Sequence, residues 1–152
     1  MAKKKEINAK FLKSGKRCNP DSYSSDNHRP IWVFDKLDKN GSFRFDISSE
    51  DFGHKDFLDK MILYSNMTWA EIKRQTHDAN KSKHHFLQLE KLSEEALERV
   101  RFYEYDKIYP NSLFSFALNN LTRVIGIRTD EFFHIVWYDK YHKFCPSKLK
   151  HT

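Results

Sequence analysis

Three runs rich in aromatic and β-branched residues follow one another near the end of this 152-residue chain, and they constrain its fold more than any other feature. The runs span residues 113–118, 123–127 and 132–138, and short polar links separate them. Aromatic and β-branched side chains favour strands, and links this short favour tight hairpins. The pattern therefore predicts an antiparallel three-stranded β-meander.

The first link sets the expected register of this meander. A two-residue loop at residues 119–120 would place Phe116 opposite Arg123. The second loop fits residues 129–130 or 130–131, and both choices give the same two faces because side chains alternate along a strand. One face is expected to carry Arg123, Ile125, Ile127, His134, Val136 and Tyr138. The other is expected to pack on helices and to carry only Val124, Gly126, Phe133, Ile135 and Trp137.

The residues before the meander predict a hairpin followed by helices. Residues 31–34 and 42–47 are β-prone on either side of an Asn-Gly turn, which favours a β-hairpin over residues 31–47. Apolar residues between 52 and 62 recur at helical spacing. Residues 78–86 show no clear period and are expected to form an exposed polar connection.

Two further helices are predicted from their start signals. Thr68 and Glu71 form a capping-box pattern, which starts a helix that should run to about His77. Ser93 is a favourable cap for a third helix, whose positive first turn would hold two glutamates. The expected architecture is thus α+β, with an N-terminal hairpin, central helices and a C-terminal antiparallel β-meander packed on helices.

Charge is concentrated at the N-terminus. The chain holds 27 Lys and Arg against 21 Asp and Glu, and residues 1–29 carry eight of the basic and three of the acidic ones. These residues contain few apolar side chains, so we expect a basic, disordered arm at residues 1–29 and a single α+β domain at residues 30–152. Such an arm attracts phosphate backbones, and Lys3, Lys4, Lys5 and Arg17 are the candidate RNA-binding residues. The alternative is a solvated arm that only aids solubility.

Composition excludes several classes of protein. No stretch approaches the roughly 20 apolar residues of a membrane span, and no apolar run follows the basic N-terminus as in a signal peptide. The two cysteines do not make a disulfide framework, so the expected location is the cytoplasm. The chain has four glycines and no Walker or dinucleotide motif, which disfavours ATPases and Rossmann oxidoreductases.

A zinc site is the one metal centre to weigh. His84 and His85, with His77 and Asp78, could be imagined as ligands. Adjacent histidines cannot both face one ion from a regular element, and neither a cysteine pair nor a regular histidine spacing supports the site. We therefore expect no metal and no other cofactor.

Polar side chains crowd the end of the third β-rich run, where a rigid strand could present them for chemistry. Metal-free RNA cleavage needs a base for the 2′-hydroxyl, a cation for the phosphorane and an acid for the leaving oxygen. The candidate base is His142 or His134, the cation is Arg123, and the acid is His142 or Tyr138. Tyr141 or Phe144 could stack a splayed base. The alternative is a half-exposed sheet face whose polar groups point to water.

The segment from Ser112 to His142 resembles the C-terminal sheet of the RelE/ParE toxin superfamily. The resemblance is carried by the strand that opens Arg123-Val124-Ile125, by the run Phe133-His-Ile-Val-Trp-Tyr-Asp and by His142, within residues 110–147. It implies a ribosome-dependent mRNA endonuclease that uses basic and aromatic side chains rather than a metal, or a gyrase poison as in the ParE branch. It also implies that Arg123 holds the scissile phosphate and that His142 or Tyr141 fills the C-terminal acid/base position.

These observations predict a toxin of a toxin–antitoxin type system that acts as a metal-independent RNA endonuclease. Its expected partners are RNA or the ribosome and an antitoxin protein, with no membrane. The expected catalytic residues are Arg123, His142, Tyr138 and His134, and Tyr141 and Lys143 join the arm as RNA-binding residues. The alternative is a non-enzymatic accessory protein that binds nucleic acid or protein and carries a basic N-terminal arm.

Overall fold

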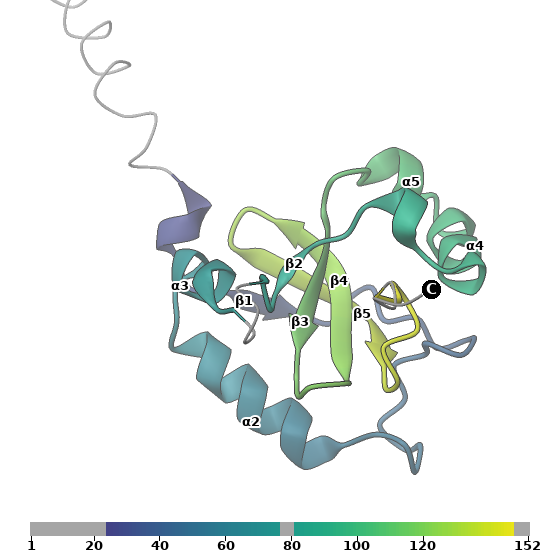
Figure 1. Ribbon diagram of the computed structural model, residues 1–152, viewed down its shortest axis with the longest axis horizontal. Coiled ribbons are helices and arrows are strands. Elements are labelled where there is room, and N and C mark those ends of the chain that lie inside the picture. The colour runs from purple at the N-terminus through teal and green to yellow at the C-terminus, as the bar shows by residue number, and fades with distance from the viewer. Residues whose placement is uncertain (1–23, 77–80, 148–152) are drawn as a thin grey trace, which may run out of the picture.

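The computed structural model describes residues 24–76 and 81–147, and within them the chain is mixed α+β (Figure 1). The strands are β1 (Ile31–Val33), β2 (His85–Phe86), β3 (Leu113–Ala117), β4 (Arg123–Thr129) and β5 (Phe132–Asp139). The helices are α2 (His54–Ser65), α3 (Trp69–Arg74), α4 (Glu94–Phe102) and α5 (Tyr105–Ile108), with short 3-10 turns η1 (Ser25–Asn27) and η2 (Leu89–Lys91). No helix in these two ranges is long and apolar enough to cross a membrane.

The described strands form one sheet in the order β1-β5-β4-β3-β2. Strands β3, β4 and β5 pair antiparallel in succession, which confirms the predicted meander. Strand β2 adds antiparallel to β3, whereas β1 pairs parallel to β5. The last strand along the chain therefore lies inside the sheet, between its first and fourth strands.

The predicted hairpin over residues 31–47 is wrong. Only β1 is a strand, and it pairs with the first half of β5 rather than with residues 42–47. The Asn-Gly turn does form, with Gly41 at a φ of 85°. Beyond it, however, Phe43 and Phe45 are drawn into separate hydrophobic cores, which outweighs the local strand preference of this segment.

The loop between β1 and α2, residues 34–53, instead runs along the second half of β5. The Asp38 N–H donates to the Val136 carbonyl, and the Tyr138 N–H donates to the Phe43 carbonyl. The fully buried Asp38 carboxylate accepts hydrogen bonds from Arg99, Tyr103 and Trp137. One carboxylate thus ties the loop to α4 and to the sheet.

The register of the first hairpin differs by one residue from the prediction. Arg123 lies opposite Ala117 rather than Phe116. The loop has three residues, because the Leu118 N–H bonds the Thr122 carbonyl and the Asn119 side chain accepts from the backbone within the loop. The two-residue prediction failed because Asn119 caps its own loop, which local sequence alone does not distinguish from a tighter turn.

A β-bulge between β4 and β5 divides the predicted polar face. Ile125 pairs with Trp137 and Gly126 with Ile135, so Val136 is the extra residue. From this point on, side chains of β5 lie on the face opposite to the one expected. Trp137 therefore shares a face with Arg123 and His134, and Tyr138 lies on the other.

Helices cover both faces of the sheet, not one as predicted. One core lies between the sheet and helices α2 and α3, and a second lies between the other face and α4 and α5. Figure 1 shows the two helix groups on either side of the strands. Buried aromatic rings fill the first core, chiefly Tyr64, Trp69, Phe114, Phe116 and Phe133. Packing side chains fill both sheet faces, and the strand ends are left to form a site.

The predicted helix starts are confirmed. Thr68 accepts from the Glu71 N–H and Ser93 accepts from the Ala96 N–H. Helix α3 ends at Arg74, before the expected position. The connection at residues 78–86 is wrong in part, because His84 is buried and β2 forms there, while residues 77–80 lie outside the described residues.

Residues 24–29, at the end of the expected arm, contact the folded body. Asp26 pairs with Lys73 on α3 and with Arg128 on β4. The Trp69 N–H donates to the His28 carbonyl, so the chain enters β1 from a fixed position. Residues 1–23, with Lys3, Lys4, Lys5 and Arg17, lie outside the described residues.

Candidate functional site

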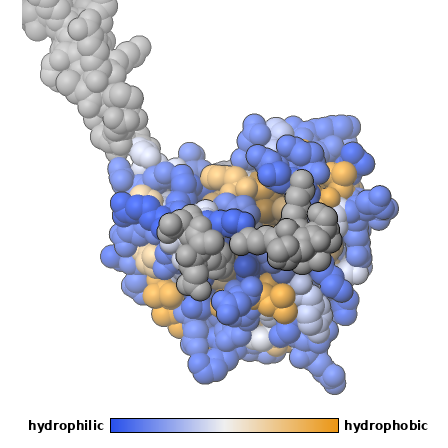
Figure 2. Space-filling model, in the orientation of Figure 1, coloured by the Kyte–Doolittle hydropathy of each residue, from blue (hydrophilic) through white to orange (hydrophobic). Residues whose placement is uncertain are grey.

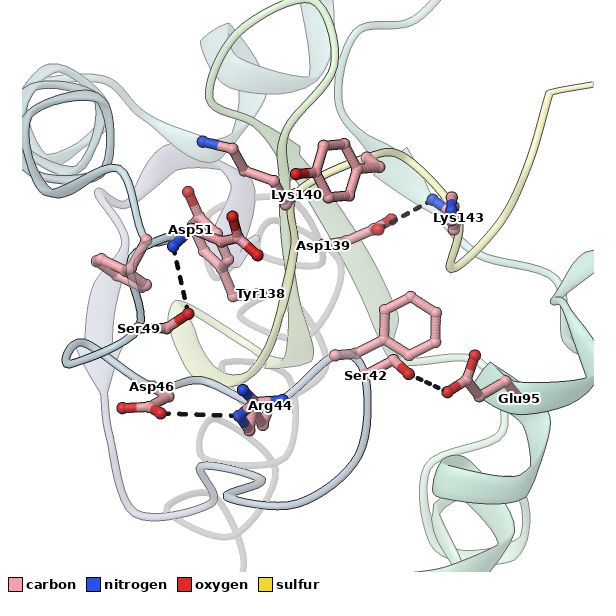
Figure 3. Close-up of a pocket in the computed structure, with 13 residues that line it drawn as sticks. Ser42, Arg44, Asp46, Ser49, Asp51, Glu95, Tyr138, Asp139, Lys140 and Lys143 are labelled. Atoms are coloured by element: carbon pink, nitrogen blue, oxygen red, sulfur yellow. Dashed lines mark hydrogen bonds and ion pairs between the residues drawn. The ribbon is translucent and has the colours of Figure 1, made fainter.

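A pocket of about 270 Å³ lies at the C-terminal end of β5. It is lined by Ser42, Phe43, Arg44, Asp46, Ser49, Asp51, Phe52, Glu95, Tyr138, Asp139, Lys140, Tyr141 and Lys143. The close-up in Figure 3 shows that these side chains come from the loop before α2, from the first turn of α4 and from the end of β5.

The pocket exists because β1 is short. With three residues, β1 pairs only with the first half of β5, and the looser loop of residues 34–53 accompanies the second half. That loop is fastened to the sheet at Asp38 and to α4 through Ser42, whose hydroxyl donates to Glu95. From Ser42 to Phe52 the loop forms the wall of the pocket that faces the end of β5.

The chain leaves β5 through a tight turn that forms one wall of the pocket. Both carboxylate oxygens of Asp139 accept backbone N–H groups, from Lys143 at 2.9 Å and from Phe144 at 2.9 Å. His142 lies inside this turn with a φ of 57°. Burial raises the pKa of Asp139, while the two amide N–H groups and the Arg123 guanidinium act in the opposite direction.

Charges of both signs line the pocket. Arg44 lies 3.7 Å from Asp46, and Ser48 hydrogen bonds hold the pKa of that aspartate below its ordinary range. Lys143 lies with its Nζ 5.7 Å from the centre of the half-exposed Tyr141 ring. A cation beside an aromatic face suits a ligand that has both a phosphate and a flat ring.

Tyr138 brings a hydroxyl to the base of the pocket. The residue is 6% exposed, its ring packs on Phe52, and its oxygen accepts the Gly53 N–H at 3.0 Å. Burial raises the pKa of Tyr138 above 10.0, so the phenol keeps its proton at neutral pH. The same hydroxyl can also donate its own proton, because a phenol is both a donor and an acceptor.

The structure brings together three of the residues predicted from the sequence. Tyr138, Tyr141 and Lys143 line the same pocket, and His142 lies in the turn between them. Two other predicted residues, His134 and Arg123, lie outside the pocket. His134 is about 15 Å further back along β5, with its Nδ1 2.7 Å from Asp35 Oδ1.

Arg123 lies beside the pocket, not in it. It is 5% exposed and opposite Asp139 across the β4–β5 pairing. Its Nη1 donates to the carbonyl oxygens of Asn119 at 2.8 Å and Thr122 at 3.1 Å. Burial lowers the pKa of this guanidinium, and attraction to Asp139 acts in the opposite direction.

The sequence reasoning missed the contribution of the loop before α2. Arg44, Asp46 and Asp51 belong to a segment interpreted as a strand and its flank, so their side chains had no assigned place. Lys140 is different, since it follows Asp139 in the same polar run and the sequence alone could have included it. No local signal in the sequence distinguishes this loop from a strand, because Phe43 and Phe45 alternate as in a strand although the fold places them in different cores.

The histidines weighed as zinc ligands have other contacts. His84 Nδ1 accepts the Ala117 N–H, and its Nε2 lies 2.7 Å from the Gln75 side-chain oxygen. His85 lies in β2, while His77 and Asp78 lie outside the described residues. Within residues 24–76 and 81–147, no three His, Cys, Asp or Glu side chains gather as a metal ion would require.

Comparisons with protein-family models, curated proteins and solved structures found no match to this chain.

Proposed function

We propose that this protein is a metal-independent RNA endonuclease of a toxin–antitoxin type system, and that the pocket at the end of β5 is its site. The observation that carries the proposal is the meeting of Tyr138, Tyr141 and Lys143 around one cavity. His142 is not among the lining residues, but it lies in the turn between Tyr141 and Lys143. The resemblance of residues 110–147 to RelE/ParE toxins supports the same reading. RNA or the ribosome, in the cytoplasm, is the proposed target, and an antitoxin protein the proposed partner.

The proposed reaction uses the ribose 2′-hydroxyl as the nucleophile. His142 takes the 2′-hydroxyl proton while the 2′-oxygen forms a bond to phosphorus. The bond from phosphorus to the 5′-oxygen breaks, and the Tyr138 phenol gives its proton to that oxygen. Lys140 and Lys143 stabilise the charge that develops on the phosphoryl oxygens. The products are a 2′,3′-cyclic phosphate and a 5′-hydroxyl end.

In this proposal the pocket also positions the nucleotide. Tyr141 is 51% exposed, and its ring can stack a base splayed out of a single strand. Lys143 beside the same ring can hold the adjoining phosphate. Stacking of this kind contributes about 1–3 kcal/mol per base.

Expression of two pocket variants tests the proposal. Tyr138→Phe removes the proposed acid together with the acceptor of the Gly53 N–H. It should lower the cleavage rate about 10²–10⁴-fold, since that is the usual contribution of general acid–base catalysis. Lys143→Ala should weaken RNA binding and cleavage together. Cleavage is followed by the appearance of 2′,3′-cyclic phosphate ends with EDTA present, alongside growth arrest in the host.

Lys55→Ala is the matched control, because Lys55 is an exposed lysine on α2 that pairs with its helix neighbour Asp59. It should leave cleavage, binding and growth arrest unchanged. Pocket variants as active as this control, or cleavage that appears only when a divalent metal is added, would refute the assignment.

A second candidate is a non-enzymatic protein-binding accessory protein. The observation in its favour is a pair of apolar side chains one turn apart on α2, Leu58 and Ile62, which are 59% and 55% exposed. Figure 2 shows several such apolar patches within a mostly hydrophilic surface. If the wild-type chain cleaves no RNA and arrests no growth, the accessory-protein hypothesis replaces the nuclease hypothesis.

A further inference from the structure

The turn after β5 is held by hydrogen bonds from a buried carboxylate. Asp139 is 2% exposed, and both of its carboxylate oxygens accept backbone N–H groups, one from Lys143 and one from Phe144. Figure 3 shows the bond from Lys143. A carboxylate accepts hydrogen bonds and donates none, so it matches two converging N–H groups. The contact closes the chain over the intervening residues 140–142.

A second tie joins this turn to the β3–β4 loop. The Thr122 hydroxyl donates to the Lys140 carbonyl at 3.1 Å, and Thr122 is 2% exposed. Beside it, Arg123 bonds the carbonyls of Asn119 and Thr122 and lies opposite Asp139. The guanidinium therefore braces the β3–β4 loop and puts a positive charge behind the Asp139 carboxylate.

The turn needs this support because of its backbone. His142 has a φ of 57°, in the left-handed region that residues other than glycine rarely adopt. A residue in such a conformation persists only where the surroundings determine it. Here the surroundings are two sets of hydrogen bonds. The Lys143 and Phe144 backbone N–H groups donate to Asp139 on one side, and the Thr122 hydroxyl donates to the Lys140 carbonyl on the other.

We infer that Asp139, braced by Arg123 and Thr122, is a positioning residue that sets the placement of Lys140 and Lys143 in the pocket and of His142 in the turn beside it. The inference rests on the proposed function and reassigns Arg123, expected from the sequence to hold the scissile phosphate, to the support of the turn. Asp139 touches no substrate in this scheme and acts only through the turn. Misplacement of reacting groups by about 1 Å commonly costs about 10²-fold in rate.

Two nearly isosteric variants test the inference. Asp139→Asn turns one accepting oxygen into an NH₂ group, which cannot accept an amide N–H. It should lower kcat for RNA cleavage about 10²-fold with a much smaller change in KM, since misplacement affects the chemical step. Thr122→Val removes the hydroxyl that donates to the Lys140 carbonyl and accepts from the Asn119 side chain, and it should lower kcat in the same direction to a lesser extent. Asp130→Asn, the same chemical change at an exposed turn residue, should change neither constant.

Amide hydrogen exchange supplies a readout that does not depend on activity. Asp139→Asn should speed exchange at the Lys143 and Phe144 amides selectively, while the amides of β3 and β4 stay protected. Unchanged exchange at these two amides, or faster exchange with kcat intact, overturns the inference. If Asp139→Asn does not fold, Thr122→Val tests the inference instead. It should lower kcat and speed amide exchange in the turn after β5, and an unchanged kcat or unchanged exchange would overturn the inference. If the wild-type chain cleaves no RNA, the proposed function fails, and the exchange data still decide whether Asp139 holds the turn.

Discussion

At the scale of single residues, Gly126 shows how one side chain determines the arrangement of many. It lies at the β-bulge, and a Cβ built there would be 2.0 Å from the backbone oxygen of His134. Only glycine lets β4 and β5 approach at this point. The bulge in turn places Tyr138 at the base of the pocket and Trp137 in the opposite core.

Gly126→Ala should therefore destabilise the protein by about 1–3 kcal/mol or more, because the clash is with backbone and cannot be relieved by a rotamer change. Urea denaturation followed by tryptophan fluorescence measures the loss. Gly53→Ala is the control, since the nearest atom to its added Cβ is the Tyr138 hydroxyl at 3.4 Å and the expected loss is under about 1 kcal/mol. Equal losses in the two variants would contradict this account of the bulge.

At the scale of elements, regular patterns were predictable and their junctions were not. Helix starts at Thr68 and Ser93 and the strands of the meander follow from local preferences that the fold respects. The β1–β5 pairing, by contrast, joins Ile31 to Phe132 and leaves no local signal in the sequence. The bulge was equally hidden, and it alone moved Tyr138 to the other face. Of the candidate site, the segment after β5 was predictable, but the loop opposite it depends on Asp38.

Asp38 also makes stability depend on pH. Burial alone would raise its pKa, but hydrogen bonds from Arg99, Asn40, Trp137 and Tyr103 outweigh burial and hold the pKa below its ordinary value of 3.8. A depressed pKa contributes stability that is complete above the unfolded value and is lost as the pH falls through the folded value. This contribution is therefore complete at neutral pH, begins to fall near pH 4 and is lost only below the folded pKa.

Asp38→Asn should unfold at lower urea concentration than the wild type at pH 7, because the amide cannot accept all of these donors. The difference between the two proteins should shrink at pH 3, where wild-type Asp38 also begins to be protonated. Urea midpoints at pH 7, 5 and 3 measure it. Other aspartates titrate in both proteins and cancel, so a difference that stays constant down to pH 3 would show that Asp38 does not titrate as described.

At the scale of the whole molecule, charge is distributed unevenly between the N-terminal segment and the rest. Residues 1–17 hold Lys3, Lys4, Lys5, Lys10, Lys13, Lys16 and Arg17 against the single Glu6. The chain enters the body at η1, beside the first residues of β5, whereas the pocket lies at the other end of that strand. An RNA held by both would have to span the length of β5, about 25 Å.

Removal of residues 1–17 should weaken RNA binding and flatten its dependence on salt, because fewer phosphates are neutralised and fewer counterions released. Binding measured between 50 and 300 mM salt gives the slope, whose magnitude on single-stranded RNA should fall by about 0.7 for each phosphate that the shortened protein leaves without a cation. Cleavage at saturating RNA should persist, since the pocket is intact. An unchanged slope would mean that the N-terminal segment does not contact RNA.

The position of β5 in the sheet has a consequence for how the protein is made. Strand β5 is made after the other four, yet it pairs with both β1 and β4. While the ribosome is still adding residues 113–131, β1 has no neighbour and the rings meant for the first core stay exposed. Contacts between residues 31 and 132 also close a long loop, which slows folding. The sheet can therefore be completed only after β5 has been made, when it can join β1 to β4.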